Sequence, residues 1–380
     1  MGLIMSEKDE IIMSLVHYFI TEENYTPIVV KGAKDEIWLE NMDGPYKVVR
    51  INSNHIHNNE QLEYDILKTK GVLKQIKKKT FSMSVNILNI FLDINKVPEN
   101  NYKNMDIVCI DSLKSVPENK ILTNAFNKIK TNLSTEEIDI EQIIQKTEDV
   151  NNKTQKKNKV YEDIFKPKTP IITNIIILTC ILYFVLMAFN TKGNLSAYNL
   201  LKYGANYQPY IKDGEWYRLF SCMFVHASIL HLLLNMYALK IIGSQVESYL
   251  GKIKYIVVFI ISGLVGSLFS AIFTKTVSVG ASGAIFGILG SLIYFTYHYR
   301  IVLGNSLKYE ILPVVLFNIL IGLFIPGVDI SAHIGGLIGG IFVTMAVGVP
   351  GKINKRSIIN GAICTFMLLG FLSYILFFYI

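Results

Sequence analysis

Acidic residues nearly disappear from the second half of this 380-residue chain. Of its 30 Asp and Glu residues, only five follow residue 170: Asp213, Glu215, Glu247, Glu310 and Asp329. Residues 1–160, in contrast, carry 22 basic and 23 acidic residues, as a soluble domain does. We therefore expect a soluble part followed by a membrane part.

Cysteine is also scarce, and its spacing predicts neither a redox-active cysteine pair nor a cysteine-ligated metal site. The four cysteines, at positions 109, 180, 222 and 364, form no CxxC pair and no metal-binding spacing. The net charge of +7 is not typical of nucleic-acid binding, because the basic run at 153–168 directly precedes an apolar segment. That placement is typical of a cytoplasmic flank beside anionic lipid.

The soluble part reads as a small α/β domain over residues 1–130. Helical spacing of apolar residues predicts helices at 9–20, 59–79 and 118–130. Extended patterns predict strands at 26–32, at 35–53 around an "MDGP" turn, at 81–94 and at 105–111. Residues 131–168 are rich in Glu, Gln, Lys and Asn, which predicts a charged linker or an exposed helix.

Seven apolar segments follow, each long enough to cross a bilayer as a helix. They cover residues 170–190, 228–248, 254–274, 282–298, 309–326, 332–349 and 357–380. Lys and Arg gather before the first segment and in the loops after the second, fourth and sixth, which lie on one side of the membrane. Because cytoplasmic loops are enriched in Lys and Arg, we expect the N-terminus inside, the 191–225 loop outside and the C-terminus outside.

Four polar side chains interrupt these segments near the same surface. His231 and Asn235 are four residues apart and share a face of the second segment. Ser282 begins the fourth segment and His333 begins the sixth. These three segments run from outside to inside, so the four residues lie at a common depth near the external surface. Each alone is more often a packing residue, but their convergence indicates function.

Together these residue types can hydrolyse an amide bond. A serine hydroxyl needs a base to take its proton, and His333 can serve Ser282 in that role. The oxyanion that forms needs hydrogen-bond donors, which His231, Asn235 and the backbone N–H of Ser282 can supply. No acidic residue of the membrane part is placed to complete a triad, so the pattern predicts a Ser–His dyad.

Glycine spacing supports this geometry. The fourth and sixth segments each carry a pair at i, i+4, Gly283 with Gly287 and Gly336 with Gly340. Small residues at this spacing let membrane helices approach closely, as the dyad requires. Phe286 lies one turn below the serine, where its ring is expected to stack on the histidine.

The motifs "HLLLNM", "GASGAIFG" and "AHIGGLIGG", in this order on alternate segments, resemble the rhomboid family of intramembrane serine proteases. The resemblance covers about residues 170–350. It implies Ser282 as nucleophile, His333 as base, and His231 with Asn235 at the oxyanion. Supporting positions are implied at Gly280, Gly283, Trp216, Arg218, His226, Gly243 and Glu247. The family's Trp-Arg element is altered, because one residue separates Trp216 from Arg218.

The resemblance also implies an architecture and partners. We expect an α-helical membrane protein with a rhomboid-like six-helix core at 169–350, an additional C-terminal helix at 351–380, a cytosolic α/β domain at 1–130 and a linker at 131–168. This arrangement resembles rhomboids of Gram-positive bacteria. The implied activity is cleavage of transmembrane segments of membrane proteins near the outer leaflet, without metal or cofactor. The motifs do not imply a role for the N-terminal domain, for which recruitment of substrates, recruitment of an adaptor and regulation of the enzyme stay open.

Three alternatives make different predictions. A catalytically silent rhomboid-like protein that binds membrane helices would lack the serine or the histidine, and both are present. A transporter or channel would carry charges at mid-membrane and inverted repeats, and the sequence has neither. A soluble serine hydrolase would carry GxSxG on a strand–turn–helix, whereas residues 280–284 read "GASGA".

Overall fold

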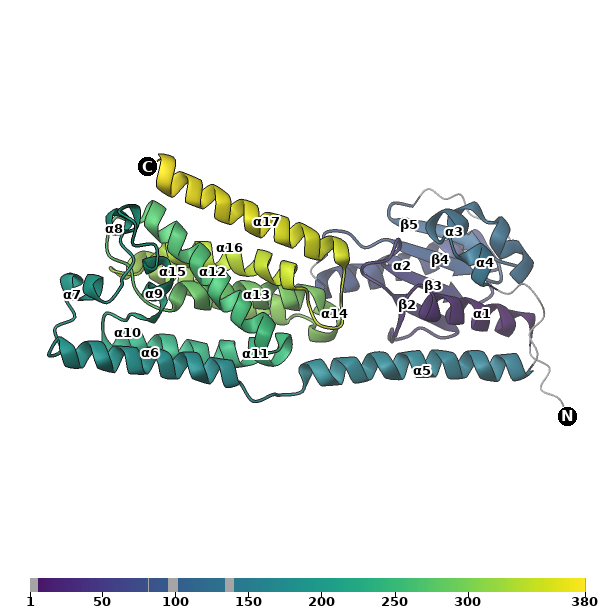
Figure 1. Ribbon diagram of the computed structural model, residues 1–380. Coiled ribbons are helices and arrows are strands. Elements are labelled where there is room, and N and C mark those ends of the chain that lie inside the picture. The colour runs from purple at the N-terminus through teal and green to yellow at the C-terminus, as the bar shows by residue number, and fades with distance from the viewer. Residues whose placement is uncertain (1–5, 81, 95–101, 134–139, 380) are drawn as a thin grey trace. The chain divides into compact units, whose positions relative to one another are not determined.

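The structure is a computed structural model that describes residues 6–80, 82–94, 102–133 and 140–379. The chain divides into two compact units, Met1–Val160 and Tyr161–Ile380. The first unit contains a sheet with helices, and the second is helical (Figure 1). Each unit is described separately below.

A five-stranded mixed sheet organises the N-terminal unit. Its strands follow the chain order β1-β2-β3-β4-β5. The first three, β1 (Thr26–Ile28), β2 (Glu36–Glu40) and β3 (Val48–Asn52), pair antiparallel. The last two, β4 (Ile87–Phe91) and β5 (Met105–Cys109), continue the sheet in parallel with β3. The switch follows from the connections, because short loops without a helix link β1 to β2 and β2 to β3, whereas helix α2 separates β3 from β4.

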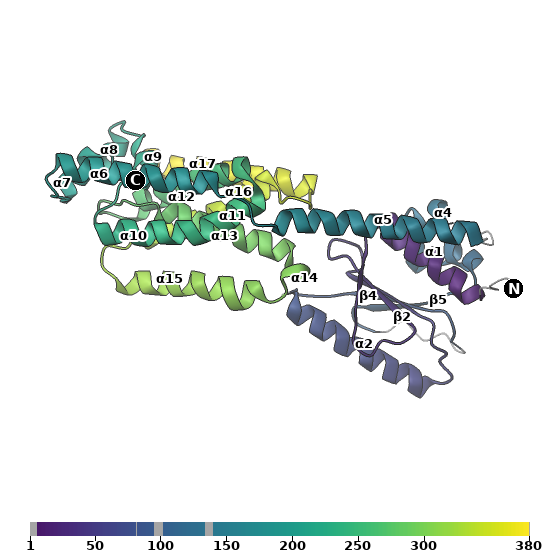
Figure 2. The ribbon, with the colours of Figure 1, turned by 90° about the horizontal axis from the view of Figure 1, so that it is seen from below.

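Helices cover both faces of this sheet (Figure 2). One face packs on α1 (Glu7–Thr21), the 3-10 helix η1 (Leu113–Glu118), α3 (Lys120–Ala125) and α4 (Ile129–Asn132). The other face packs on α2 (Asn59–Lys79). Alternate residues of each strand supply the two cores, as the two-residue period of a strand requires. Leu88 and Ile90 face α1, whereas Ile87 and Phe91 face α2.

A buried ionic cluster interrupts the α2 face. The guanidinium of Arg50, fully buried on β3, donates to both carboxylate oxygens of Asp65 at 2.6 Å and to Glu36 at 3.0 Å. Lys68 donates to the second oxygen of Glu36 at 2.7 Å. Burial acts to raise the pKa of Glu36, but hydrogen bonds from Arg50 and Lys68 outweigh it and hold the pKa below its usual value.

The segment predicted as one helix over 118–130 instead forms two short helices. The first of these helices, α3, ends at its C-cap Phe126, whose backbone has φ −127° and ψ 84°. This conformation lets the side chain enter the core, where it is 1% exposed and its ring centroid lies 5.2 Å from that of Phe19. Burial of an aromatic ring outweighs the few helical hydrogen bonds lost here.

The charged segment at 131–168 contains the long helix α5 (Ile140–Phe165), while its residues 134–139 lie outside the described ones. Polar side chains of α5 bond to α1. Lys146 donates to Ser14 at 3.1 Å, and Asp149 pairs with His17 at 3.5 Å. Up to Val160, α5 therefore belongs to the N-terminal unit.

Six helices among the described residues of the second unit are long and apolar enough to cross a membrane. They are α6 (Ile171–Asn190), α10 to α11 (Ile229–Leu250), α12 (Lys252–Phe273), η4 with α15 (Leu307–Phe324), α16 (Ile330–Val347) and α17 with η5 (Lys355–Tyr379). A seventh, α13 (Ser282–His298), has 17 residues, at the short end of the range that spans a bilayer. Each begins and ends within two residues of its predicted position.

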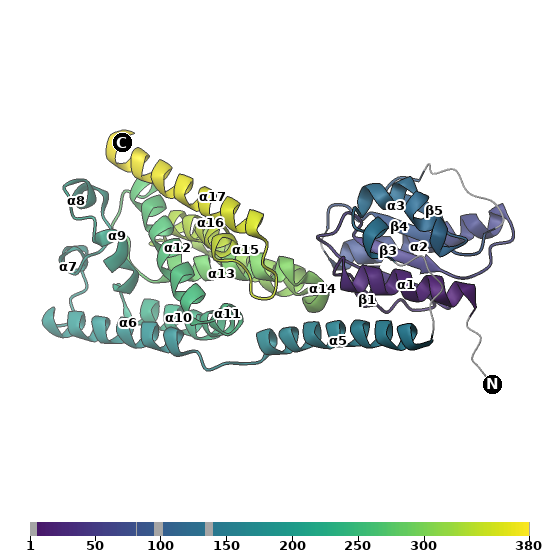
Figure 3. The same cartoon turned by 45° about the vertical axis from the view of Figure 1, so that its right-hand side comes forward.

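Helices α12, α13 and α16 form the centre of the bundle, and α6, α10, α15 and α17 surround them (Figure 3). Burial follows this order, because 56% of an apolar 18-residue stretch of α12 is buried, against 17% of the corresponding stretch of η4 with α15. Alternate helices run in the same direction. The N-terminal ends of α10, α13 and α16 therefore lie together at one end of the bundle (Figure 1).

The sequence predicts a long loop over residues 191–225, whereas the segment 191–228 between α6 and α10 contains short helices. These are α7 (Ala197–Lys202), α8 (Gln208–Lys212), α9 (Arg218–Ser221) and the 3-10 turn η2 (Cys222–Phe224). Ile211 of this segment is buried among Leu268 of α12 and Leu372 and Leu376 at the end of α17. Such contacts across more than 150 residues give the segment a core of its own.

Candidate active site

Helix α10 presents His231 and Asn235 from its first turns. Its N-cap is Ser228, whose hydroxyl accepts a hydrogen bond from the His231 backbone N–H at 3.1 Å. The Asn235 side chain is buried, and its amide donates to the His231 carbonyl at 2.9 Å. The i, i+4 spacing places both side chains on one helix face, and this bond fixes the Asn235 amide.

The turn before α13 passes beside these side chains. Gly280 has φ +113°, a backbone conformation that favours glycine. A Cβ at Gly280 would lie 2.7 Å from the Nε2 atom of His231 and 3.8 Å from the amide nitrogen of Asn235. Glycine is therefore needed here for space as well as for conformation. Because Gly280 precedes Ser282 by two residues, this contact places the His231–Asn235 face of α10 beside the start of α13.

Ser282 is the first residue of α13 and is half-buried. The first N–H groups of a helix have no acceptor within the helix, so they point toward any group bound at this end. The dipole of α13 also favours negative charge here. The position combines a hydroxyl, free N–H donors and a favourable field at one point.

His333 lies in the first turns of α16 and is 7% exposed. Its imidazole stacks on the ring of Phe286 from α13, with centroids 4.1 Å apart and planes 11° from parallel. This is the stacking predicted from the one-turn offset between Ser282 and Phe286. It fixes the plane of the imidazole.

A glycine seam joins α13 to α16. A Cβ at Gly336 would lie 1.9 Å from the carbonyl oxygen of Gly283, and a Cβ at Gly340 would lie 1.9 Å from that of Gly287. Two helices can approach this closely only where side chains are absent. The predicted glycine pairs therefore face one another along two turns.

The seam continues to the residues beside Ser282 and His333. A Cβ at Gly283 would lie 3.4 Å from the carbonyl oxygen of Ala332. Ser282 directly precedes Gly283, and His333 directly follows Ala332. The structure thus brings the Ser282 and His333 positions together across the start of the two helices.

Trp216, Arg218 and Glu247 lie apart from this set. Arg218 is buried and donates to the carbonyl of Leu201 at 2.6 Å, so it ties together the 191–228 segment. Trp216 is 64% exposed, and its ring lies 5.7 Å from that of Phe377 on α17. Both residues thus have contacts that organise the segment between α6 and α10.

Glu247 lies at the opposite end of the bundle. Its carboxylate accepts hydrogen bonds from the Ile172 backbone N–H at 2.9 Å, and from the N–H and hydroxyl of Thr173 at 2.8 and 2.7 Å. It therefore caps the first turn of α6 and has a structural role.

Two further polar residues border the site. His226, which the sequence marked only through the resemblance, is fully buried with its ring centroid 5.2 Å from that of His231. Asp329, which the sequence assigned to a loop, is the N-cap of α16 and accepts from the Ala332 N–H at 3.0 Å. An Asp shortly before the predicted start of a helix is a signal for an N-cap, and this signal would have identified Asp329.

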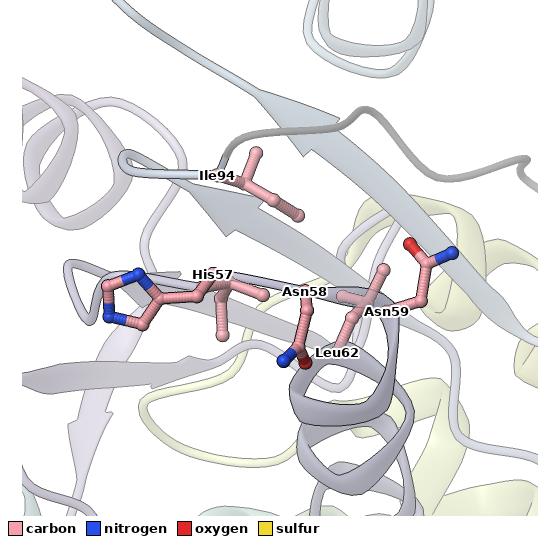
Figure 4. A pocket seen from close by; sticks show the side chains of 6 residues that line it. His57, Asn58, Asn59, Leu62 and Ile94 are labelled. Atoms are coloured by element: carbon pink, nitrogen blue, oxygen red, sulfur yellow. The ribbon is translucent and has the colours of Figure 1, made fainter.

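The N-terminal unit contains a cavity of about 240 Å³, whose lining, among the described residues, includes no serine beside a histidine. It is lined by Ile56, His57, Asn58, Asn59, Leu62 and Ile94 (Figure 4). The neighbouring His55 is paired with Asp93 at 2.6 Å. Within the described residues, no three His, Cys, Asp or Glu side chains are arranged to hold a metal ion.

Comparison with known proteins identifies the class. The family model for the Rhomboid domain matches residues 213–349. "Rhomboid protease GluP" of Bacillus subtilis is 26% identical over 363 residues, which are 91% of this chain and 71% of the relative. "Rhomboid protease AarA" of Providencia stuartii is 30% identical over 211 residues, 48% of this chain and 75% of the relative. "RHOMBOID-like protein 4" of Arabidopsis thaliana is 36% identical over 159 residues, 40% of each chain.

These relatives show that the protein is an intramembrane serine protease. The chain belongs to the rhomboid family. It is a multi-pass membrane protein of the Gram-positive type, in which a small α/β domain precedes the rhomboid bundle and one helix follows it.

Proposed function

We propose that this protease cuts transmembrane segments of membrane proteins with a Ser282–His333 dyad. The observation that carries the proposal is the glycine seam, which brings the backbones of α13 and α16 into contact at Gly283–Gly336 and Gly287–Gly340. A backbone contact of this kind holds the two helix ends at a fixed distance, as proton transfer between two side chains requires.

The proposed reaction follows the general course of serine hydrolysis. The Ser282 oxygen attacks the peptide carbonyl carbon while its proton moves to the imidazole of His333. The tetrahedral intermediate collapses when the imidazolium returns this proton to the departing amine, which leaves an ester on the serine. Water then adds to the ester with the same histidine as base, and the free serine is restored.

His231, Asn235 and the Ser282 N–H are proposed to stabilise the oxyanion of each intermediate. The close fit of Gly280 against the His231 ring supports this, because it keeps both side chains beside the serine turn. Hydrogen-bond donors that are positioned before the reaction stabilise the transition state without reorganisation. We expect Asn235→Ala to lower kcat by about 100-fold, as for the loss of one oxyanion donor.

We further propose that cleavage takes place near the outer leaflet. Basic residues gather at the end of the bundle opposite to Ser282: Lys166, Lys168, Lys252, Lys254, Arg300, Lys308, Lys352, Lys355 and Arg356. The positive-inside rule makes that end cytoplasmic and the serine end external. Alkaline phosphatase fused after residue 379 should be active outside the cell. An active fusion at residue 250 instead would reverse the orientation.

Labelling of the serine tests the dyad directly. A fluorophosphonate probe should react with the wild-type protein and not with Ser282→Ala or His333→Ala, and neither variant should cleave a model transmembrane substrate. Ser291→Ala is the matched control, because Ser291 is buried two turns further along α13. Retained cleavage by Ser282→Ala would remove this residue from the nucleophile role.

The same labelling tests the alternative of a silent protein that binds membrane helices. Such a protein would bind the substrate and leave the probe unreacted. The dense glycine seam and the Phe286–His333 stacking favour the enzyme, because binding alone requires no fixed imidazole.

For residues 1–130 we propose a cytosolic docking role toward an adaptor. The domain has hydrophobic cores of its own, so its fold does not depend on the protease bundle. Deletion of this domain should leave the labelling rate of Ser282 unchanged and alter which cellular substrates are cut. Unchanged cleavage of all substrates would contradict this role.

A further inference from the structure

Asp329 is held in one orientation just before the helix that carries His333. Its Oδ1 atom accepts two hydrogen bonds, from the Ala332 backbone N–H and from the Thr274 hydroxyl, both at 3.0 Å. Its backbone carbonyl accepts from the His333 N–H at 3.3 Å. These contacts account for one carboxylate oxygen and fix the side-chain rotamer.

The other carboxylate oxygen has no such explanation. The Oδ2 atom of Asp329 is buried, and within the described residues it has no hydrogen-bond partner. None of the ion pairs formed by the described residues includes Asp329. Burying a carboxylate oxygen without a partner is costly, and an N-cap needs only one acceptor, which Asn or Ser would supply as well.

A matching donor lies one turn along the same helix. The Nδ1 atom of His333 is also buried and has no hydrogen-bond partner among the described residues. Residues at i and i+4 share a helix face, and the Cα–Cβ bonds of a helix tilt toward its N-terminus. The His333 side chain therefore leans over the turn that begins with Asp329. The stacked ring of Phe286 keeps it there.

We propose that Asp329 is a positioning residue for His333, with its Oδ2 atom bound to the Nδ1–H through one buried water. Two buried polar groups at the mouth of the site are the partners that such a water requires. The contact would keep the proton on Nδ1, so that Nε2 is free to accept the proton of Ser282. The ionised carboxylate would then stabilise the imidazolium while remaining unprotonated itself.

This inference rests on the proposed dyad and extends it. The titratable groups that act on the imidazole are Asp329 on its own helix and His231 on α10, with His226 behind the latter. Asp329 is the acidic one among them. Its proposed action is on the tautomer and charge of His333, and not on the substrate.

Asp329→Asn separates this role from helix capping. The Asn side-chain oxygen can still accept from Ala332 and Thr274, so the cap and the fold are kept. Only the charge is lost, and an N–H donor replaces the acceptor that faces Nδ1. We expect kcat for a model transmembrane substrate and the rate of fluorophosphonate labelling to fall by about 10- to 100-fold, with KM within about twofold of wild type.

Two further variants complete the test. Asp329→Ser also keeps a capping oxygen and should show the same loss of kcat. Asn354→Ala removes a cap of the same type from α17 at the far end of the bundle, and should lower Tm while kcat is unchanged. All rates are measured at least 15 °C below the Tm of each variant, so that unfolding does not contribute.

Wild-type kcat and labelling rates in Asp329→Asn would overturn the inference and leave Asp329 as a cap alone. An equal loss of kcat in Asn354→Ala would overturn it too, because the loss would then follow from removing a helix cap. The result for Ser282→Ala keeps this outcome separate from the proposed function. If that variant still reacts with the probe, the dyad itself is wrong, whatever Asp329 does.

Discussion

Replacing Gly340 with alanine would place a methyl group against the backbone of a neighbouring helix. A Cβ at this position lies 1.9 Å from the Gly287 carbonyl oxygen, whereas ordinary van der Waals contact begins at 3.4 Å. Neither atom belongs to a flexible side chain. Helices α13 and α16 would therefore have to separate by roughly 1.5 Å at this level, because packed interiors leave no free volume to absorb the methyl group.

The expected magnitude follows from this displacement. Overpacking of this kind costs about 1–3 kcal/mol, and each kcal/mol lowers the Tm of a unit of this size by about 2–4 °C. His333 lies seven residues earlier on the same helix, roughly 10 Å along its axis, so part of the separation reaches the dyad. Since a misplacement of about 1 Å can cost 100-fold in rate, we expect kcat to fall by about 10- to 100-fold.

The assay measures cleavage of a transmembrane substrate in liposomes together with the Tm of each purified variant. Gly370→Ala is the control, because Gly370 lies on the membrane helix α17 with nothing within 4 Å of its added Cβ. Alanine there should keep the wild-type rate and raise the Tm slightly, as it favours the helix. A Gly340→Ala protein with wild-type Tm and kcat would refute the view that the seam sets the geometry of the dyad.

Three other predictions concern the polar contacts that hold the fold. Glu247→Ala should lower the Tm by several degrees, because unpaired buried N–H groups cost about 1–3 kcal/mol each, while Ser282 still reacts with the probe at low temperature. Arg50→Ala should destabilise the N-terminal domain by about 3–5 kcal/mol, because it leaves Asp65 buried without its cation and Glu36 paired with Lys68 alone. Hydrogen exchange in the full chain should then be faster throughout the sheet of this domain and unchanged in the membrane bundle. Because the pKa of Glu36 is lowered from 4.5, the domain should be fully stable above that pH and lose stability as the pH falls through the lowered value. The Tm of the Glu36→Gln variant should therefore change less than that of the wild type as the pH is lowered.

Membrane helices were predictable because the bilayer imposes one simple requirement on each. A helix must present about 20 apolar residues, and no other part of the chain can substitute for them. The sequence therefore gives the start of α13 at Ser282 without error. The stacking of Phe286 on His333 was equally accessible, since it depends on a one-turn offset and on two helices being neighbours.

Contacts between distant segments could not be read from local patterns. The break at Phe126 depends on a pocket formed by α1, more than 100 residues earlier. The short helices of 191–228 are stabilised by α12 and α17, so the segment alone reads only as polar and aromatic. The buried oxygen of Asp329 is visible only when the burial of each atom is known.

The packing of α17 on the 191–228 segment has a consequence for biosynthesis. The C-terminal end of α17 with η5 packs on the 191–228 segment, where Leu372 and Leu376 cluster with Ile211 and Phe377 contacts Trp216. Among the described helices, this is the last to be synthesised. Until that helix enters the bilayer, the segment over the scissile centre lacks its support. Full support of this segment, and with it full activity, is therefore expected only once α17 has entered the bilayer.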